Sequence, residues 1–122
     1  MNEATKIELP YPPSANTYYR HIAINGHPRT LLSKKGREYR RIVASLLAVA
    51  RSKPTERPVA VTLAVNPPDN RRRDLDNILK SLLDALEYGG AYKDDSQIEE
   101  LHIMRCEVQR PLGRVVVFIQ ER

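Results

Sequence analysis

The sequence predicts a single small α+β domain in which a mixed β-sheet of about four strands packs against two helices. Four segments show strand patterns, and two others carry apolar residues at helical spacing. These segments alternate in the order β-(hairpin)-α-β-α-β-β. The 122 residues suffice for one domain, residues 1–122, with its own hydrophobic core.

The N-terminal segments predict a strand and then a hairpin. Residues 6–9 alternate in polarity, and a proline-rich segment, residues 10–13, ends that strand. Residues 17–20 and 29–32 are the two expected strands of the hairpin. Asn25-Gly26 supplies its turn, because this dipeptide tolerates the positive φ angles that tight hairpins require.

The two helices are expected at residues 33–51 and 74–86, with Ser33 as the first N-cap. The apolar stripe of the first helix comprises Tyr39, Val43, Leu46, Leu47 and Ala50. That of the second comprises Leu75, Ile78, Leu79, Leu82, Leu83 and Leu86. Whether this second stripe faces only its own sheet, or also a partner, stays open at this point.

Three further strands complete the predicted sheet. Residues 59–65 lie between the helices, and residues 98–108 and 114–120 follow the second helix. We expect the last two strands to pair antiparallel, because only a short turn joins them. Cys106 falls in register with other apolar residues of its strand, which favours a buried position.

Composition excludes several classes of protein. No apolar run approaches the roughly 18 residues of a membrane span, and the first residues lack a signal-peptide core, so no membrane partner and a cytoplasmic location are expected. The single cysteine excludes an internal disulfide and a thiolate-rich zinc site. The net charge of +5 makes a polyanion a plausible partner, and it is unevenly distributed: residues 1–73 carry +9 and residues 74–122 carry −4.

The candidate catalytic residues cluster where the strand at 59–65 leads into the second helix. Asp74 and Asp76 project to one side if this segment is extended, and a helix N-terminus favours anionic groups. A simpler explanation makes Asp74 an N-cap and Asp76 a first-turn acid, but it leaves the adjacent triple arginine unexplained. Lys80 shares a helix face with Asp76, and spacing alone favours an exposed ion pair over a catalytic lysine by roughly two to one.

A second acidic pair, Asp94-Asp95, precedes the strand at 98–108. Neighbouring aspartates in a loop are usually solvated turn residues. If the loop folds back over the start of the second helix, however, one of them adds a third carboxylate to Asp74 and Asp76. Hard oxygen ligands of this kind select Mg²⁺ or Mn²⁺ over zinc. The three histidines show no metal-ligand spacing.

These motifs resemble the RusA family of Holliday junction resolvases, many of which are carried by phages and prophages, over nearly the whole chain. The matching segments are Leu9-Pro10-Tyr11-Pro12-Pro13-Ser14, Tyr18-Tyr19-Arg20, residues 33–51, Arg72-Arg73-Asp74-Leu75-Asp76-Asn77 with Lys80, Asp84-Ala85-Leu86, Asp94-Asp95 and Gln97. An Asp-x-Asp motif alone is a weak signal. The flanking arginines, the lysine and the second acidic pair make it specific.

The resemblance implies a structure-selective endodeoxyribonuclease that resolves four-way DNA junctions by paired, Mg²⁺-dependent hydrolysis, with Mn²⁺ able to substitute. It implies that Asp74, Asp76 and Asp95 are metal ligands and that Lys80 is catalytic, with Asp94 ranked second. It also implies a homodimer, whose two-fold symmetry suits a two-fold junction. Such a protein would act on DNA in the cytoplasm of a bacterial or phage-infected cell, associated with the nucleoid.

Basic and aromatic residues are the expected DNA contacts. Those suited to phosphate are Arg71, Arg72, Arg73, Arg20, Lys34 and Lys35. Tyr18 and Tyr19 can stack on unpaired bases, although packing in the core or in a dimer interface is slightly favoured for either one.

Two other functions stay open. A non-enzymatic nucleic-acid-binding protein, whose aspartates only balance arginines, would need no divalent metal. A related nuclease acting on other branched DNA or on RNA is also compatible with the sequence, because phosphate contacts carry little information about the substrate, but a four-way junction endonuclease is favoured over both.

Overall fold

A computed structural model describes residues 4–50 and 52–122. Its elements are β1 (Ala4–Pro10), α1 (Ala15–Tyr18), β2 (Tyr19–Ile24), β3 (His27–Leu32), α2 (Lys34–Val49), β4 (Val59–Asn66), η1 (Leu75–Ile78), α3 (Leu79–Tyr88), η2 (Asp95–Gln97), β5 (Ile98–Arg105) and β6 (Arg114–Glu121). Four strands form one sheet in the order β1-β6-β4-β5, and β2 pairs with β3 in a separate ribbon. The predicted α+β class with a mixed sheet is confirmed.

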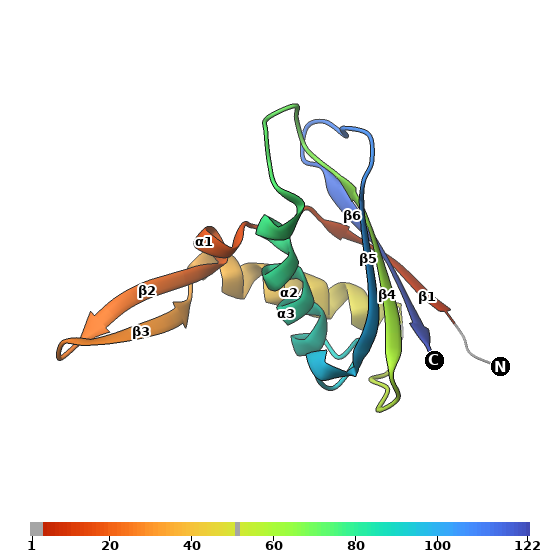
Figure 1. Ribbon diagram of the computed structural model, residues 1–122, viewed down its shortest axis with the longest axis horizontal. Helices are drawn as coiled ribbons and strands as arrows, with labels where there is room; N and C mark the ends of the chain where they lie inside the picture. The colour runs from red at the N-terminus through yellow and green to blue at the C-terminus, as the bar shows by residue number, and fades with distance from the viewer. Residues whose placement is uncertain (1–3, 51) are drawn as a thin grey trace.

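Figure 1 shows α2 and α3 on one face of the sheet, with the ribbon of β2 and β3 projecting away from both layers. Within the described parts of the chain, no helix is long and apolar enough to cross a membrane.

The predicted antiparallel pairing of the last two strands is wrong. β5 pairs in parallel with β4, whereas β6 lies between β1 and β4 and is antiparallel to both. Parallel neighbours need a long crossover, which η1 and α3 provide between β4 and β5. Alternation of polarity specifies a strand but not its neighbour, so the sequence pattern did not distinguish the two pairings. As a consequence, β5 is an edge strand.

The core lies between the sheet and the two helices. β4 alternates strictly between buried and half-buried residues along its whole length. The helix residues that pack against it include Tyr39, Val43 and Leu47 of α2 and Leu82, Ala85 and Leu86 of α3. Burial of each large side chain contributes about 1.5–3 kcal/mol. The expected burial of Cys106 is wrong, because β5 ends at Arg105 and the thiol lies exposed beyond it.

Ser33 caps α2 as predicted. Its hydroxyl oxygen accepts the backbone N–H of Gly36 at 3.0 Å, and the hydroxyl also reaches the carbonyl oxygens of Thr17 and Tyr18, at 2.5 and 3.0 Å. The same serine therefore begins the helix and joins it to α1. Tyr18 lies in α1 and not in the predicted hairpin strand, which begins at Tyr19.

We expect Gly36→Ala to destabilise the protein by about 1–3 kcal/mol, the usual cost of overpacking. Alanine in a helix normally stabilises by about 1 kcal/mol relative to glycine. Here, however, a Cβ would overlap the carbonyl oxygen of Tyr18. Urea unfolding measures the difference. The control Ser45→Ala, at an exposed position of α2, should stay within about 0.5 kcal/mol of wild type. A Gly36→Ala protein as stable as wild type would contradict this packing.

Candidate active site

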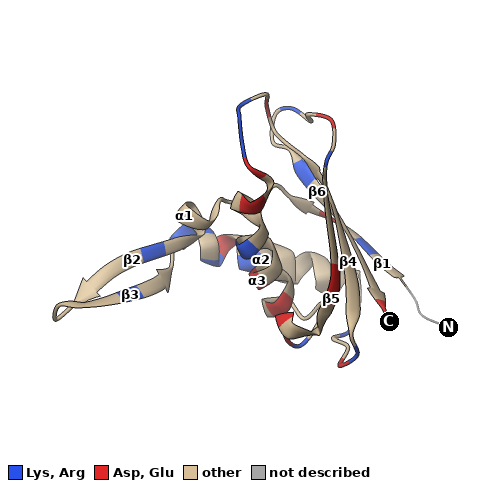
Figure 2. Ribbon diagram, in the orientation of Figure 1, with Lys and Arg blue, Asp and Glu red and all other residues tan. Residues whose placement is uncertain are grey.

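The segment between β4 and η1 forms an arginine-lined hollow. Asp69 organises it by accepting the backbone N–H of Arg71 at 2.9 Å and a guanidinium N–H of Arg73 at 2.6 Å. Arg105, at the end of β5, donates to the carbonyl oxygen of Arg73. The hollow has a volume of about 300 Å³, and Arg72 also lines it. Figure 2 shows this basic segment directly beside the acidic start of η1.

Asp74 and Asp76 lie at that acidic start, and both are exposed. Asp74 occupies the N-cap position of η1 with extended backbone angles (φ −84°, ψ 141°), but its side chain makes no capping hydrogen bond. Asp76 lies in the first turn. Among the described residues, no hydrogen bond or ion pair engages either carboxylate. The simpler explanation of Asp74 as a side-chain cap is therefore not what the structure shows, and both carboxylates are available to a ligand.

Asp95 lies at the opposite end of α3. Its backbone N–H donates to Oε1 of Glu87, in the last turn of the helix, at 2.8 Å. Burial raises the pKa of the Asp95 carboxyl, a hydrogen bond from Tyr92 lowers it, and the neighbouring negative charges of Glu87, Asp84 and Asp94 raise it further. The Asp95 loop therefore contacts the second half of α3, whereas Asp74 and Asp76 lie before α3, at the start of η1.

The expectation that the Asp95 loop folds over the start of the second helix is therefore wrong. In the described part of the chain, no group of three or more His, Cys, Asp or Glu residues is placed to hold a metal ion. A single chain brings Asp74 and Asp76 together but leaves Asp95 apart from them.

Asp94 has a structural role. Its carboxylate accepts the backbone N–H of Ser96 at 2.8 Å, and the side chain of Gln97 accepts the backbone N–H of Asp94, also at 2.8 Å. This is a capping box at the start of η2. The hydrogen bond from the Ser96 backbone lowers the pKa of Asp94. This carboxylate is therefore engaged within its own short helix.

Lys80 is exposed on α3, with its Nζ 4.9 Å from the ring centroid of Tyr19. The ion pair with Asp76 that the spacing predicts is wrong, because no ion pair joins Lys80 to Asp76 among the described residues. Residues 75–78 form a 3-10 helix with three residues per turn, so the i,i+4 alignment of an α-helix does not extend across them.

Tyr18 is fully buried, so its predicted role in base stacking is wrong and packing is the correct explanation. Its hydroxyl donates to Asp84, which Arg40 holds with hydrogen bonds of 2.8 and 3.0 Å. Burial first, and then the hydrogen bond to Asp84, raise the pKa of Tyr18. This network joins α1, α2 and α3. The sequence pattern did not reveal it, and membership of Asp84 in a family motif was the only signal.

The remaining predicted DNA contacts are accessible to different degrees. Tyr19 is half-buried and meets Tyr18 edge-to-face, with centroids 4.9 Å apart. Arg73 is half-buried in its ion pair with Asp69. The exposed members are Arg20, Lys34, Lys35, Arg71 and Arg72.

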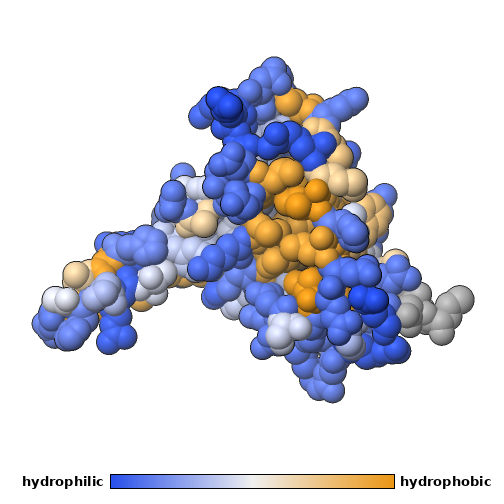
Figure 3. All heavy atoms as spheres, in the orientation of Figure 1, coloured by the Kyte–Doolittle hydropathy of each residue, from blue (hydrophilic) through white to orange (hydrophobic). Residues whose placement is uncertain are grey.

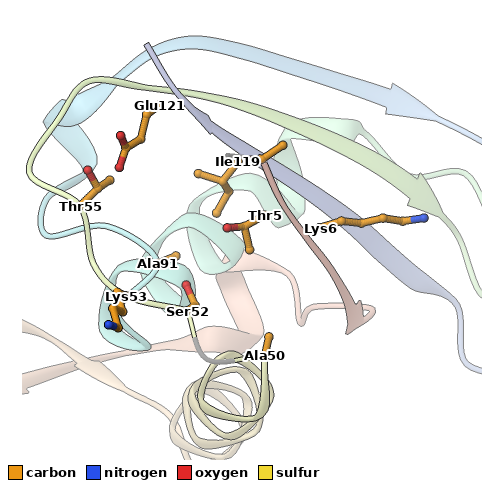
Figure 4. A pocket seen from close by; sticks show the side chains of 10 residues that line it. Thr5, Lys6, Ala50, Ser52, Lys53, Thr55, Ala91, Ile119 and Glu121 are labelled. Atoms are coloured by element: carbon orange, nitrogen blue, oxygen red, sulfur yellow. The ribbon is translucent and has the colours of Figure 1, made fainter. Parts of the chain in front are cut away.

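A larger cavity, of about 710 Å³, lies elsewhere, between β1, the end of α2 and the segment that follows it. Figure 4 shows Thr5, Lys53, Thr55 and Ile119 among its lining side chains. None of the predicted site residues lines it, so it is separate from the candidate active site.

Comparison with known proteins gives a family match. The family model described as endodeoxyribonuclease RusA matches residues 10–120. A crossover junction endodeoxyribonuclease of Enterobacteria phage HK97 is 38% identical over 122 residues, covering 99% of this chain and 97% of the relative. The crossover junction endodeoxyribonuclease RusA of Escherichia coli K12 is 38% identical over 116 residues, covering 94% and 92%. The protein of the same name from Shigella sonnei is 37% identical over 116 residues, with the same coverage.

We expect Asp69 to stay ionised at pH values where most aspartates are protonated. The guanidinium hydrogen bond from Arg73, and then the Arg71 backbone N–H, hold its pKa well below the usual range. The contribution of the ion pair with Arg73 to stability is therefore fully present above the unfolded pKa of about 3.9, and it is lost as the pH falls through the depressed folded value, where the ion pair itself breaks. Carboxyl ¹³C NMR titration measures this. Arg73→Gln should raise the pKa towards its ordinary value, and Arg72→Gln should not. Titration of wild-type Asp69 near 3.9 would show that the ion pair is absent.

Proposed function

Because the chain belongs to the RusA family of endodeoxyribonucleases, we propose that it resolves four-way DNA junctions by paired, divalent-cation-dependent hydrolysis of phosphodiester bonds. The names of its relatives, crossover junction endodeoxyribonucleases, supply the reaction class and the branched DNA substrate. The structural observation that carries the proposal is the pair of exposed, unengaged carboxylates of Asp74 and Asp76 beside three arginines.

The donor set suits a hard cation. Asp74 and Asp76 offer only carboxylate oxygens and have no partner among the described residues, so binding a cation breaks no existing interaction. With Asp95 they would hold Mg²⁺, and Mn²⁺ should substitute. When bound, such a cation activates water and offsets the charge that builds up on a phosphodiester. In a purely DNA-binding protein, the two carboxylates would instead repel the nearby phosphates without compensation.

The basic residues of the site act on the DNA itself. Arg71 and Arg72 are exposed and bind backbone phosphates. Asp69 holds the guanidinium of Arg73 in one place, which fixes the loop beside Asp74. Lys80 places an ammonium group on the exposed side of α3, where it stabilises the negative charge that develops on the scissile phosphate.

An apolar surface lies between the two separated parts of the proposed metal site. Its half-buried or exposed side chains are Leu75, Leu79 and Leu83 along η1 and α3, and Leu101 and Ile103 on the edge strand β5. Leu101 and Ile103 are directly paired with core residues of β4, so they face the helix side of the sheet. Figure 3 shows an apolar patch over the region of α3 and β5. Patches of this kind mark association surfaces.

A second copy of the chain is the partner we propose for this surface. In a two-fold dimer whose axis runs perpendicular to α3, the two α3 helices are antiparallel. The start of η1 in one chain then lies beside the end of α3 in the other. Asp74 and Asp76 of one protomer would meet Asp95 of its partner. The separation within one chain is thus the arrangement that an intersubunit site requires.

Two such sites per dimer suit the substrate. Resolution of a four-way junction needs two nicks on opposing strands, and a two-fold dimer presents two equivalent sites to a two-fold junction. Once the first strand is cut, the second site is already bound to the same molecule, so the second cut is effectively intramolecular. The proposed enzyme acts on DNA in the cytoplasm of a bacterial or phage-infected cell.

The test of the function is direct. Purified protein is incubated with a synthetic four-way junction, or with linear duplexes of the same sequence, with and without Mg²⁺. We expect paired nicks on the junction only with Mg²⁺, and little cutting of the duplexes. Binding without any cutting would favour the non-enzymatic alternative, and preferential cutting of flaps or RNA would favour another nuclease.

We expect Asp74→Asn, Asp76→Asn and Asp95→Asn each to lower the cleavage rate at least about 100-fold, or about 2.7 kcal/mol of transition-state stabilisation. Junction binding should be retained or become tighter, because a negative charge near phosphate is removed. Single-turnover cleavage and fluorescence anisotropy measure the two effects. Asp94→Asn is the matched control, and it should keep most of the activity. Near wild-type cleavage by one of the first three variants would remove that residue from the ligand set.

We expect Leu101→Glu to give a folded monomer that has lost cleavage. Leu101 is 37% exposed on the edge strand, so a charge there disturbs the proposed interface more than the core. Leu112, which is 78% exposed after β5, supplies the control Leu112→Glu, which should stay dimeric and active. Analytical ultracentrifugation at micromolar protein gives the mass of each. A wild-type protein that is monomeric in solution and cuts the junction as a complex of one chain with one junction would contradict the dimer.

A further inference from the structure

The ribbon formed by β2 and β3 is an arm that leaves the body of the protein (Figure 1). Six residue pairs build it, from Tyr19 opposite Leu32 to Ile24 opposite His27, and Asn25 and Gly26 close it with φ angles of 52° and 78°. At about 3.3 Å per residue it reaches roughly 20 Å outwards. Of residues 20–31, all but Ile22 are exposed.

The arm contributes little to the core. Only its base is attached: Tyr19 and Leu32 pack against the core, and Arg37 donates to the carbonyl oxygen of Leu32 at 2.8 Å. A two-stranded hairpin that does not pack against other elements is at best marginally stable in water. An extension of this kind is therefore explained better by a partner that it contacts than by the fold.

The two faces of the arm differ. Directly opposed residues project from the same face, so the cross-strand register places the following side chains together: Arg20, Ile22, Ile24, His27, Arg29 and Leu31. This face, here called the cationic face, combines two arginines with aliphatic side chains. Among the described residues, neither arginine has an ion-pair partner, and residues 19–32 include no Asp or Glu. The partner expected from this chemistry is anionic and offers apolar contact as well.

The arm also begins at the proposed active site. Tyr19 is its first residue, and Nζ of Lys80 lies 4.9 Å from the centroid of the Tyr19 ring. Exposed Lys34 and Lys35 follow one residue after the other end of the arm. Cationic side chains therefore run from α3 past the base of the arm and out along it.

We propose that the β2–β3 arm is a second DNA-binding element, which lies in a groove of one duplex branch of the junction, outside the active site. This inference rests on the proposed function for its substrate. A two-stranded ribbon fits a major groove about 12 Å wide. Arg20 and Arg29 contact backbone phosphates, and Ile22, Ile24 and Leu31 contact sugars and base edges. Contact between the arms of two copies is disfavoured, because it would bring their arginines together.

Two arm variants test the proposal. One lacks Ile22, Ala23, Pro28 and Arg29, which removes two cross-strand pairs but keeps the turn and the alternation of faces. The other, Arg20→Gln with Arg29→Gln, keeps the full arm. The charge-matched control is Lys6→Gln with Lys53→Gln, both of which are exposed and line the cavity away from the site. Junction binding is measured without divalent metal over a range of salt concentrations, with hydroxyl-radical footprints of each complex.

Both arm variants should bind the junction at least about tenfold more weakly than wild type. The slope of log K against log[salt] should flatten by about one unit for each phosphate that the variant no longer binds. The double variant loses two such contacts in each protomer, so its slope should flatten by about four for the bound dimer. The footprint should lose protection on two symmetry-related branches, one for each arm of the dimer, away from the crossover, while the control stays unchanged.

An unchanged slope and footprint would overturn the proposal, as would arm variants that become monomeric, since the arm would then be an assembly element. These readouts need no cleavage. An inactive wild-type protein with an arm-dependent footprint would therefore refute the proposed function and leave the arm as a DNA-binding element.

Discussion

The parallel pairing of β4 with β5 is the constraint on which the rest of the structure depends. Parallel strands cannot be joined by a tight turn, so a crossover helix must run between them. That helix places Asp74 and Asp76 at one end and Asp95 at the other. The same topology leaves β5 at the sheet edge, with apolar side chains that the helices do not fully cover. The separation of the proposed ligands and the uncovered face therefore have one physical origin, and an antiparallel two-fold dimer would account for both.

The aspartates fall into two groups: those whose carboxylates are held by hydrogen bonds or ion pairs, and those whose carboxylates are available to a ligand. Asp69 and Asp84 are held by arginines, and Asp94 caps a short helix. Asp74 and Asp76 have no such partner among the described residues. A basic surface attracts DNA, but two unpaired carboxylates beside it repel phosphate unless a cation lies between them. The acids with partners stabilise the local structure, and the two without partners lie where we propose that the chemistry takes place.

Local sequence signals predicted the helices and strands, but they did not predict the contacts between residues that are far apart in the sequence. The Ser33 cap, the Asn25-Gly26 turn and the alternation of β4 each depend on neighbouring residues, and each is confirmed. The partner of β5 is not encoded locally, so the expected pairing of the last strands was wrong. The hydroxyl of buried Tyr18 donates its hydrogen bond to Asp84, 66 residues away. The site residues were found through a family motif, but their separation along α3 could be learned only from the topology.

The central claim is that each metal site is shared between two protomers, and subunit mixing tests it most directly. Asp74→Asn and Asp95→Asn chains, each inactive alone, are unfolded together and refolded as one sample. In a shared site, the mixed dimer pairs the intact Asp74 of one chain with the intact Asp95 of the other. Random mixing then restores about a quarter of the sites, since half of the dimers are mixed and each has one intact site. We predict Mg²⁺-dependent nicking of one strand per junction. A mixture as inactive as its separate components would contradict the shared site.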